Sequence, residues 1–487
     1  MHLSSLPSRY GIGTMGREAR AFVDFLAEAG QSVWQLLPIC PTSYGDSPYQ
    51  SFSTFAGNPY FIDLDLLAGD GLLEPEDYQN LNWGSSQTEV DYGLLYETRY
   101  PVLHRAVENF LKKNQPEFER FCAEQGWLGD YALFMALKDS NGGAPWWDWA
   151  EPLRNRDPEA IRQAEEQHRD GITFWKVLQF LFYRQWDGLK QYAHEKKMSI
   201  MGDMPIYVSL DSVDVWAHPE LFQLDGNKIP CEVAGCPPDG FSADGQLWGN
   251  PLFDWDYMEA TGYRWWVDRI GYLCRVYDQL RIDHFRGFDA YYAIPYGDKT
   301  ARNGRWRPGP GMKLFRAVDK ALGPQNIIAE DLGFLTDSVR QLLQDSGYPG
   351  MKVMELGFDS RDPGSSDYLP HSFPVRCVAY VGTHDNDTAE GWMQAADPED
   401  AALARKYLGL NPSEGYSWGM MRGLWASAAE LTVVQAQDLL GLGLACRMNT
   451  PSTVGLNWKW RAAPGAFTHQ LAAKLRERMG MYDRLNQ

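Results

Sequence analysis

Residues 280–287 read LRIDHFRG, a short apolar run that ends in a carboxylate and is followed by a glycine. Two later stretches have the same design, residues 327–333 (IIAEDLG) and residues 381–387 (VGTHDND). Short apolar runs bounded by turn-forming residues are typical of buried strands in a parallel sheet. The three stretches therefore predict three buried strands, each with an acidic residue at its C-terminal end: Asp283, Glu330 and Asp385.

Similar apolar runs recur along the chain, and helix-like patterns separate several of them. We predict strands at residues 33–38, 199–208, 280–285, 326–329, 351–355, 378–382 and 442–448, with an eighth starting at His2. A helical face ending at Gly30 and another ending at Gly347 indicate the alternation of strand and helix that builds a parallel sheet. If these runs are the strands of a barrel, their C-terminal ends bring the three carboxylates into one site.

The spacing of the predicted strands is uneven. The long interval between residues 38 and 199 reads as helices, notably over 108–122 and 172–194, and predicts an inserted helical subdomain over residues 60–175. Residues 211–256 are rich in Gly, Pro, Asp and aromatics, and we expect a long loop or subdomain at the active site over 209–256. No linker divides the chain, so residues 1–487 are predicted to form a single catalytic unit.

The composition points away from polyanionic partners. Lys and Arg number 45 against 64 Asp and Glu, giving a net charge of -19, which disfavours nucleic acid and anionic membrane surfaces. The 19 Trp and 25 Tyr could fill the core or stack on the apolar faces of sugar rings. A neutral substrate is the interpretation that fits both features.

The cysteines and the N-terminal sequence bear on the compartment. Seven scattered cysteines suit a reducing environment, and the spacing of Cys231 and Cys236 is not that of a zinc knuckle. Residues 1–13 lack the basic start and apolar middle of a signal peptide, and no segment has the length of a membrane span. We therefore expect a cytoplasmic protein with no membrane partner.

A carboxylate at the end of one strand is often only a helix cap or an ion-pair partner, but three in series suggest chemistry. Cleaving a glycosidic bond uses one carboxylate to attack, a second, protonated one to donate to the leaving oxygen, and a third to hold sugar hydroxyls. A metal site at His384, Asp385 and Asp387 is the alternative, although a second nearby His is missing. The sequence contains no P-loop, dinucleotide fingerprint or Gly-x-Ser-x-Gly elbow.

Over essentially its whole length the sequence resembles the amylomaltases and plant disproportionating enzymes, which are 4-alpha-glucanotransferases. The matching motifs are residues 2–13 (HLSSLPSRYGIG), 47–50 (SPYQ), 202–208 (GDMPIYV), 237–251 (PPDGFSADGQLWGNP), 281–288 (RIDHFRGF), 329–333 (AEDLG), 382–387 (GTHDND) and 447–460 (RMNTPSTVGLNWKW). The resemblance implies an α/β fold, a (β/α)8 TIM barrel with inserted, mostly helical subdomains and long loops around the active site. It also implies catalysis without a metal or organic cofactor.

The resemblance also implies roles for individual residues. Asp283 would be the nucleophile, Glu330 the general acid and then base, and Asp385 the group that grips the ring hydroxyls at the transition state. His284 and His384 would assist, and Arg281, two positions before Asp283 on one strand face, would keep Asp283 ionised. The residues implied to line the sugar groove are Ser47, Tyr49, Asp203, Gln246, Trp248 and Asn457.

Two positions depart from the family pattern. Relatives usually carry several more apolar residues before the equivalent of His2, so the first strand is expected to be short or disturbed. At Gly240 the family commonly has Tyr, which implies the loss of one aromatic wall of the groove.

Three functions remain open on the sequence. The first is transfer of an α-1,4-glucan segment to the 4-hydroxyl of an acceptor glucan or glucose, in starch- or glycogen-type metabolism of maltooligosaccharides. The second is an alpha-glucan hydrolase that uses the same carboxylates with water as the acceptor. The third, a silent glucan-binding protein, would not need Asp283 and Glu330. The motif at residues 237–251 favours transfer.

Overall fold

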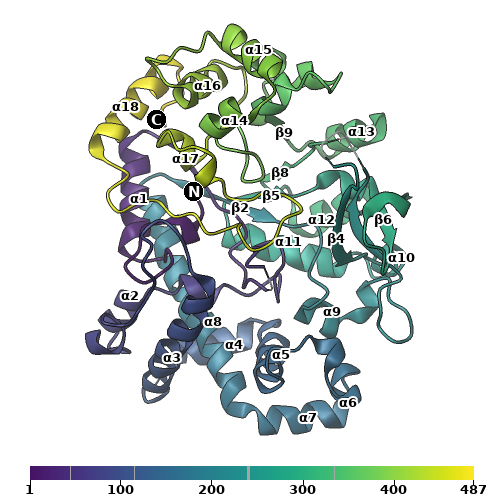
Figure 1. Cartoon of the computed structure of the whole chain (residues 1–487). Helices are drawn as coiled ribbons and strands as arrows, with labels where there is room; N and C mark the ends of the chain where they lie inside the picture. Colours follow the sequence, from purple (N-terminus) through teal and green to yellow (C-terminus); the bar gives the residue numbers. More distant parts are fainter. Residues whose placement is uncertain (44, 115, 239–241, 334, 487) are drawn as a thin grey trace.

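The computed structural model describes residues 1–487 except 44, 115, 239–241, 334 and 487. At its centre, parallel strands follow one another in space in the order of the sequence (Figure 1). One sheet pairs β1 (Val33–Gln35), β2 (Ser199–Met204), β5 (Gln279–Ile282) and β8 (Ile327–Ala329), and another pairs β9 (Gly350–Val353), β10 (Cys377–Tyr380) and β11 (Leu431–Val433). The Ala329 amide donates to the Pro349 carbonyl at 2.9 Å, which joins β8 to β9. This succession is that of a (β/α)8 barrel, of which seven parallel strands form among the described residues.

The strands form because both of their faces are covered. One set of their side chains, including Leu280 and Ile282, belongs to the large core that also contains the surrounding helices. The alternate set, including Met201, Ile328 and Met351, forms a separate cluster. Covering both faces explains why these strands read as continuous apolar runs. The outer helices include α1 (Arg17–Glu28), α8 (Arg169–Glu195), α11 (Arg264–Val276), α12 (Met312–Leu322) and α13 (Asp337–Ser346).

The predicted strands at 442–448 and at His2 are wrong. Residues 444–446 form a 3-10 turn, and the seventh strand of the succession is β11, from residues that the sequence pattern did not single out. Leu3–Ser5 is also a 3-10 helix, while Met1 and His2 lie between β1 and β11 beside a cavity. The Trp34 indole on β1 donates to the Met1 carbonyl at 2.7 Å, so Met1 lies against β1 without forming a strand. Short runs next to turns carry too little periodicity to separate these outcomes.

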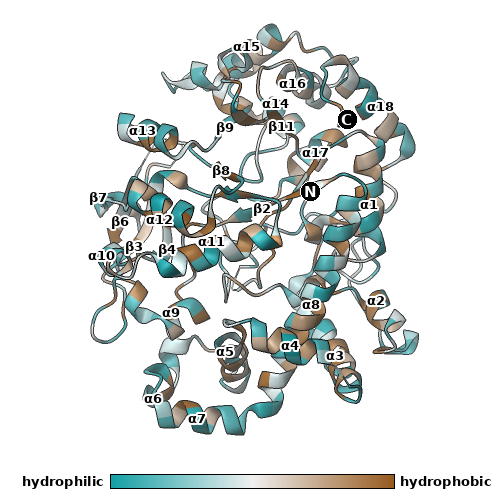
Figure 2. Cartoon of the chain, turned by 180° about the vertical axis from the view of Figure 1, so that it is seen from behind, coloured by the Kyte–Doolittle hydropathy of each residue, from teal (hydrophilic) through white to brown (hydrophobic). Residues whose placement is uncertain are grey.

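The chain between β1 and β2 is helical and extends away from the barrel (Figure 1). Its helices are α2 (Leu64–Gly69), α3 (Tyr92–Leu111), α4 (Pro116–Glu124), α5 (Leu128–Ser140), α6 (Glu151–Arg154), α7 (Pro158–Gln167) and α8. The 27-residue α8 packs along α5 and leads into β2. In Figure 2, α7 at the periphery is mostly hydrophilic, whereas brown residues gather near the centre.

A second, antiparallel sheet flanks the C-terminal ends of β2 and β5. Its order is β4 (Gln246–Pro251), β3 (Glu232–Cys236), β6 (Ala290–Pro295) and β7 (Arg305–Pro308). The stretch predicted as an irregular loop thus contains two strands, together with α9 (Val213–Ala217) and α10 (Trp255–Ala260). Gly235 is required in this sheet, because a Cβ there would lie 2.1 Å from the Gln246 carbonyl oxygen.

The C-terminal part wraps back to the start of the chain. It comprises α14 (Ala389–Ala395), α15 (Pro398–Leu408), α16 (Tyr416–Trp425), α17 (Ala436–Leu439) and α18 (His469–Met481). Helix α18 packs on α1, so the chain ends lie on the same side of the molecule (Figure 1). Within the described residues, no helix has the length and apolar character needed to cross a bilayer.

Candidate active site

The three carboxylates lie just after the C-terminal ends of β5, β8 and β10. The Asp283 amide donates to the Met204 carbonyl at 3.0 Å, and the Glu330 amide donates to the Ile282 carbonyl at 3.0 Å, which continues the ladder one residue beyond the strands. His284 then adopts a left-handed conformation with φ 49°, ending β5 abruptly. Asp385 follows β10 in a turn closed by the Asn386 side chain, which accepts from the Thr383 amide at 2.9 Å.

Asp283 shares a buried guanidinium with Asp203. Arg281 Nη1 lies 3.2 Å from Asp283 Oδ1 and 2.6 Å from Asp203 Oδ2, and the Arg281 side chain is only 5% exposed. Tyr49 donates its hydroxyl to Asp203 Oδ2 at 2.6 Å, so Asp203 is satisfied from two sides. Burial alone would lower the pKa of Arg281, but Asp203 and Asp283 hold it well above its usual value. Arg281 is thus a permanent cation at the base of the site.

The surroundings of Asp283 act in opposite directions on its charge. Burial raises the pKa of Asp283 well above its ordinary value, and the neighbouring carboxylates of Asp203, Glu330 and Asp385 add to the rise. The ion pair with Arg281 opposes these effects by stabilising the charged form. The Arg281 contact therefore favours an ionised Asp283 in a place where burial does not.

Glu330 is held rigidly by backbone groups. Its Oε2 accepts from the His284 amide at 2.7 Å, and its Oε1 accepts from the Leu332 amide at 2.8 Å. Burial raises the pKa of Glu330, although Arg281 and these two amides act against the rise. The carboxyl consequently keeps its proton to higher pH than a free glutamate does, which suits a proton donor.

Asp385 is the most open of the three, with about half of its side chain exposed. Its Oδ1 accepts from Asn449 Nδ2 at 2.6 Å and lies 3.4 Å from His384 Nε2. The His384 ring stacks on Tyr49 with centroids 5.1 Å apart. Burial lowers the pKa of His384, so its imidazole is neutral at pH 7.

His284 offers an unused polar atom. Burial lowers its pKa to about 3, so it is neutral, and its buried Nε2 has no hydrogen-bond partner among the residues that the structure describes. The ring meets Trp248 edge to face at 4.9 Å. Trp248 in turn donates its indole N–H to Gln246 Oε1 at 3.1 Å. These contacts place Gln246 and Trp248, both on β4, beside the end of β5.

The remaining predicted groove residues are less directly connected to the carboxylates. Ser47 Oγ accepts from the Tyr49 amide at 3.2 Å and so shapes the turn that presents Tyr49. Asn457 accepts from the Thr450 amide at 3.0 Å and donates to the Thr453 carbonyl at 2.9 Å. The contacts of Asn457 hold together the 450–457 loop. The ring centroid of the neighbouring Trp458 lies 5.9 Å from the ring centroids of both Tyr49 and His384. Gly240, where an aromatic wall was predicted to be lost, lies outside the described residues together with Phe241.

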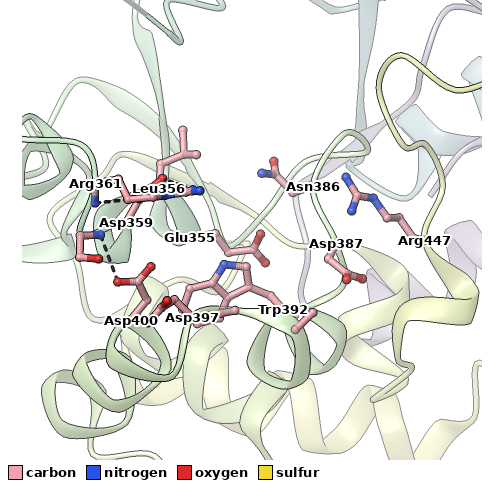
Figure 3. A pocket seen from close by; sticks show the side chains of 13 residues that line it. Glu355, Leu356, Asp359, Arg361, Asn386, Asp387, Trp392, Asp397, Asp400 and Arg447 are labelled. Atoms are coloured by element: carbon pink, nitrogen blue, oxygen red, sulfur yellow. Dashed lines mark hydrogen bonds and ion pairs between the residues drawn. The ribbon is translucent and has the colours of Figure 1, made fainter. Parts of the chain in front are cut away.

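The motif at 447–460 also brings in Arg447 and Asn449, which the sequence reasoning quoted but did not single out. Both contact Asp385, and Arg447 lines a separate cavity of about 360 Å³ behind the Asp385 turn (Figure 3). Asp387 and Glu355 line this cavity, which Asp385 does not (Figure 3). The alternative of a metal site at His384, Asp385 and Asp387 gains no geometric support, since no three such side chains converge as metal ligands within the described part of the chain.

A parallel barrel with three carboxyl groups at its strand ends, one of them ion-paired to a buried arginine, is typical of enzymes that act on glycosidic bonds. The chain belongs to the 4-alpha-glucanotransferase family, whose model matches residues 1–467. It is 48% identical over 489 residues to the 4-alpha-glucanotransferase of Clostridium butyricum, covering 99% of this chain and 100% of the relative. It is 46% identical to that of Thermus thermophilus, covering 100% and 98%.

The solved structures give the same result. The amylomaltase from Streptococcus agalactiae in complex with acarbose superimposes with a TM-score of 0.97 at 45% identity, covering 100% of this chain and 99% of that one. The amylomaltase from Corynebacterium glutamicum, at 20% identity and a TM-score of 0.75, shares the fold over 100% of this chain and 74% of that one. The hydrolase interpretation gains no support from these relatives.

Proposed function

We propose that this chain transfers a segment of an α-1,4-glucan to the 4-hydroxyl of an acceptor glucan or glucose by a retaining double displacement. The observation that carries the proposal is the pairing of Asp283, ion-paired to Arg281, with Glu330, whose carboxyl two backbone amides hold at the end of the adjacent strand. Family membership supports transfer, and the geometry supports the assignment of roles.

In the first displacement, Asp283 attacks the anomeric carbon while the bond from that carbon to the glycosidic oxygen breaks. Glu330 donates its proton to that oxygen, so the reducing-end fragment leaves with a free 4-hydroxyl. Positive charge develops on the sugar carbon, and Asp385 stabilises it through the ring hydroxyls. The neutral His284 and His384 donate or accept hydrogen bonds there without adding repulsive positive charge.

In the second displacement, the ionised Glu330 removes the proton from an acceptor 4-hydroxyl, whose oxygen attacks the anomeric carbon. The ester bond to Asp283 breaks, and the carboxylate is restored beside Arg281. Two inversions at one carbon leave the product in the α configuration. No step requires a metal or an organic cofactor.

The sugar groove is proposed to run past Ser47, Tyr49, Asp203, Gln246, Trp248 and Asn457. Tyr49 and Trp248 supply aromatic faces next to two of the carboxylate-bearing segments, since one stacks on His384 and the other meets His284. Transfer rather than hydrolysis requires that a bound acceptor hydroxyl outcompete water, which positioning in such a groove achieves through effective concentration.

We retain two further interpretations from the sequence as proposals. Residues 60–175 act as an inserted helical subdomain and residues 209–256 as an active-site subdomain of one catalytic unit. A cytoplasmic location agrees with the thin scatter of seven cysteines along the chain.

Incubation with pure maltotriose tests the proposed activity. Transfer yields glucose together with a ladder of longer maltooligosaccharides, and the number of reducing ends stays nearly constant. Asp283→Asn, which removes the nucleophile, is the control for contaminating activity. A steady rise in reducing ends without products longer than maltotriose would establish the hydrolase instead.

A further inference from the structure

The third carboxylate needs an external support. Asp385 lies in the turn after β10 with about half of its side chain exposed, and its own turn offers two contacts, both at 3.4 Å: His384 Nε2 to the carboxylate and Thr383 Oγ1 to the backbone amide. A carboxylate that must meet two sugar hydroxyls in one orientation loses effectiveness if it can rotate. The support comes from a segment more than sixty positions later in the sequence, residues 447–449.

Three hydrogen bonds connect residues 447–449 to the Asp385 turn, and a fourth joins Arg447 to Asn449 within the segment. Asn449 donates its side-chain amide to Asp385 Oδ1 at 2.6 Å and its backbone amide to the His384 carbonyl at 3.1 Å. Arg447 donates from Nη2 to the Asp385 carbonyl at 2.5 Å and from Nε to the Asn449 carbonyl at 2.8 Å. The carboxylate, the backbone on both sides of it and the supporting segment itself are therefore held together.

The segment is itself anchored from behind. Met448 is 4% exposed and belongs to a core cluster with Leu37, Trp458 and Trp460, and the Trp458 amide donates to its carbonyl at 2.8 Å. Arg447 also lines the cavity that Glu355 and Asp387 line (Figure 3), while its N–H groups donate to the Asp385 and Asn449 carbonyls.

We propose that Asn449 and Arg447 form a positioning clamp for Asp385. By donating to Oδ1, Asn449 fixes the rotamer of the Asp385 carboxylate and leaves Oδ2 directed to the sugar. Arg447 holds the backbone of Asp385 by donating to its carbonyl. The inference rests on the proposed role of Asp385 in stabilising the transition state, and it holds for transfer and hydrolysis alike. Neither clamp residue is a proton donor or nucleophile in the reaction.

The clamp predicts a specific kinetic pattern for Asn449→Ala. With maltotriose, kcat falls by about 100-fold because the misplaced carboxylate acts on the transition state, while KM changes by less than about threefold. The matched control is Asn303→Ala, which removes a similar amide-to-carboxylate hydrogen bond, to Asp298 at 3.0 Å, on the surface. We expect the control to keep the parent's kcat, and both variants to keep the parent's thermal midpoint.

A double-mutant cycle separates positioning from general structural damage. Rates are measured with α-maltosyl fluoride, whose leaving group needs no proton, so that slow variants remain measurable. If Asn449 acts through Asp385, Asn449→Ala lowers the rate of the parent strongly but lowers the rate of Asp385→Asn by less than about threefold. Equal losses in both backgrounds, or a kcat of Asn449→Ala equal to that of the control, would overturn the clamp.

Arg447 gives an independent arm should Asn449→Ala fail to fold. Arg447→Met removes every donor and lowers kcat, whereas Arg447→Lys keeps one charged donor and restores part of the loss. Equal activity of the lysine and methionine variants contradicts the proposal. Failure of the proposed function is distinguishable, because a parent that only hydrolyses maltotriose would still require the clamp.

Discussion

Asp283 and Glu330 end neighbouring strands, and both are buried, but their surroundings differ in one respect. Asp283 has a guanidinium at 3.2 Å, whereas the direct partners of Glu330 are two neutral backbone amides. The direct ion pair favours the charged form of Asp283 against burial and neighbouring carboxylates, which raise its pKa, whereas burial raises the pKa of Glu330 without a direct ion pair to oppose it. This difference in direct partners supports the proposed roles of nucleophile and proton donor.

The difference predicts the behaviour of Glu330→Gln. With maltotriose, kcat/KM falls by roughly 10²- to 10⁴-fold, because the leaving oxygen departs without a proton. With α-maltosyl fluoride, formation of the glucosyl ester proceeds near the parent's rate, since fluoride needs no acid. A variant that is equally poor with both donors would show that Glu330 has a role other than proton donation.

Glu330 also predicts how kcat/KM depends on pH. Because burial raises the pKa of Glu330, the basic limb of the parent's kcat/KM profile lies above the ordinary glutamate value of 4.5. Activity falls as pH rises through this limb, since the first displacement requires the protonated form. The limb should disappear in Glu330→Gln assayed with the fluoride donor. Persistence of an unchanged limb in that variant would assign it to another group.

At the scale of elements, the site depends on contacts between pieces that are distant in sequence. Strand β4 brings Trp248 to the end of β5, where its ring meets His284 at 4.9 Å. The antiparallel sheet that holds β4 is therefore part of the groove wall. Helix α17 holds the start of α14 in place, because buried Asp438 on α17 accepts from the Ala389 amide at 2.8 Å.

Trp248→Ala tests the wall formed by β4. Loss of the ring removes an apolar face for a sugar and opens the end of β5 to water, so we expect hydrolysis to rise relative to transfer. Product analysis on maltotriose would show more reducing ends per transfer event than in the parent. Trp306→Ala on β7 of the same sheet, 39% exposed, is the control, and equal ratios in the two variants would argue against a groove wall at β4.

Asp438→Asn tests the link between α17 and α14. Burial raises the pKa of Asp438 to about 7, so the folded state binds a proton that the unfolded state, with a pKa near 3.8, has lost. The protonated Asp438 therefore contributes fully to the parent's free energy of unfolding below pH 4. This contribution falls as pH rises to about 7, by on the order of 4 kcal/mol. In Asp438→Asn the side-chain oxygen still accepts from the Ala389 amide, and the side chain carries no charge at any pH. The free energy of unfolding of the variant should therefore fall less than that of the parent as pH rises.

Urea unfolding of both proteins at pH 5 and pH 8 measures the effect. We expect the decrease in unfolding free energy between the two pH values to be smaller in Asp438→Asn than in the parent. Identical decreases would mean that Asp438 does not retain its proton in the folded protein.

At the scale of the whole molecule, the helical insertion is joined to the barrel by aromatic packing. Trp216 on α9 is fully buried, packs on Phe134 of α5 and Trp149, and donates its indole N–H to the Leu153 carbonyl at 3.0 Å. Helix α9 follows β2, so this tryptophan connects the insertion to the segment that leads into the active-site sheet.

Trp216→Ala should therefore destabilise the protein without changing its chemistry. Removing a buried tryptophan costs about 3–5 kcal/mol through lost burial and the cavity left behind. Thermal or urea unfolding measures the loss, while kcat per folded molecule stays within about twofold of the parent's at a temperature where the variant is folded. A large fall in kcat with unchanged stability would place Trp216 in the catalytic mechanism.

The sequence by itself determined the strands that carry the carboxylates. These strands, Gln279–Ile282, Ile327–Ala329 and Cys377–Tyr380, are buried almost throughout, so their apolar character is continuous and visible locally. The helical character of the chain between β1 and β2 could also be predicted from the sequence, because helix periodicity is a local property.

Only the tertiary structure decided the rest. The strand β11, the 3-10 turn at residues 444–446 and the antiparallel sheet depend on partners far along the chain, because a short strand is stable only when another strand pairs with it. The contact of Asn449 with Asp385 and the raised pKa of Glu330 arise in the same way. Hydrogen bonds and burial depend on distances in space, and folding brings together residues that the order of the sequence keeps apart.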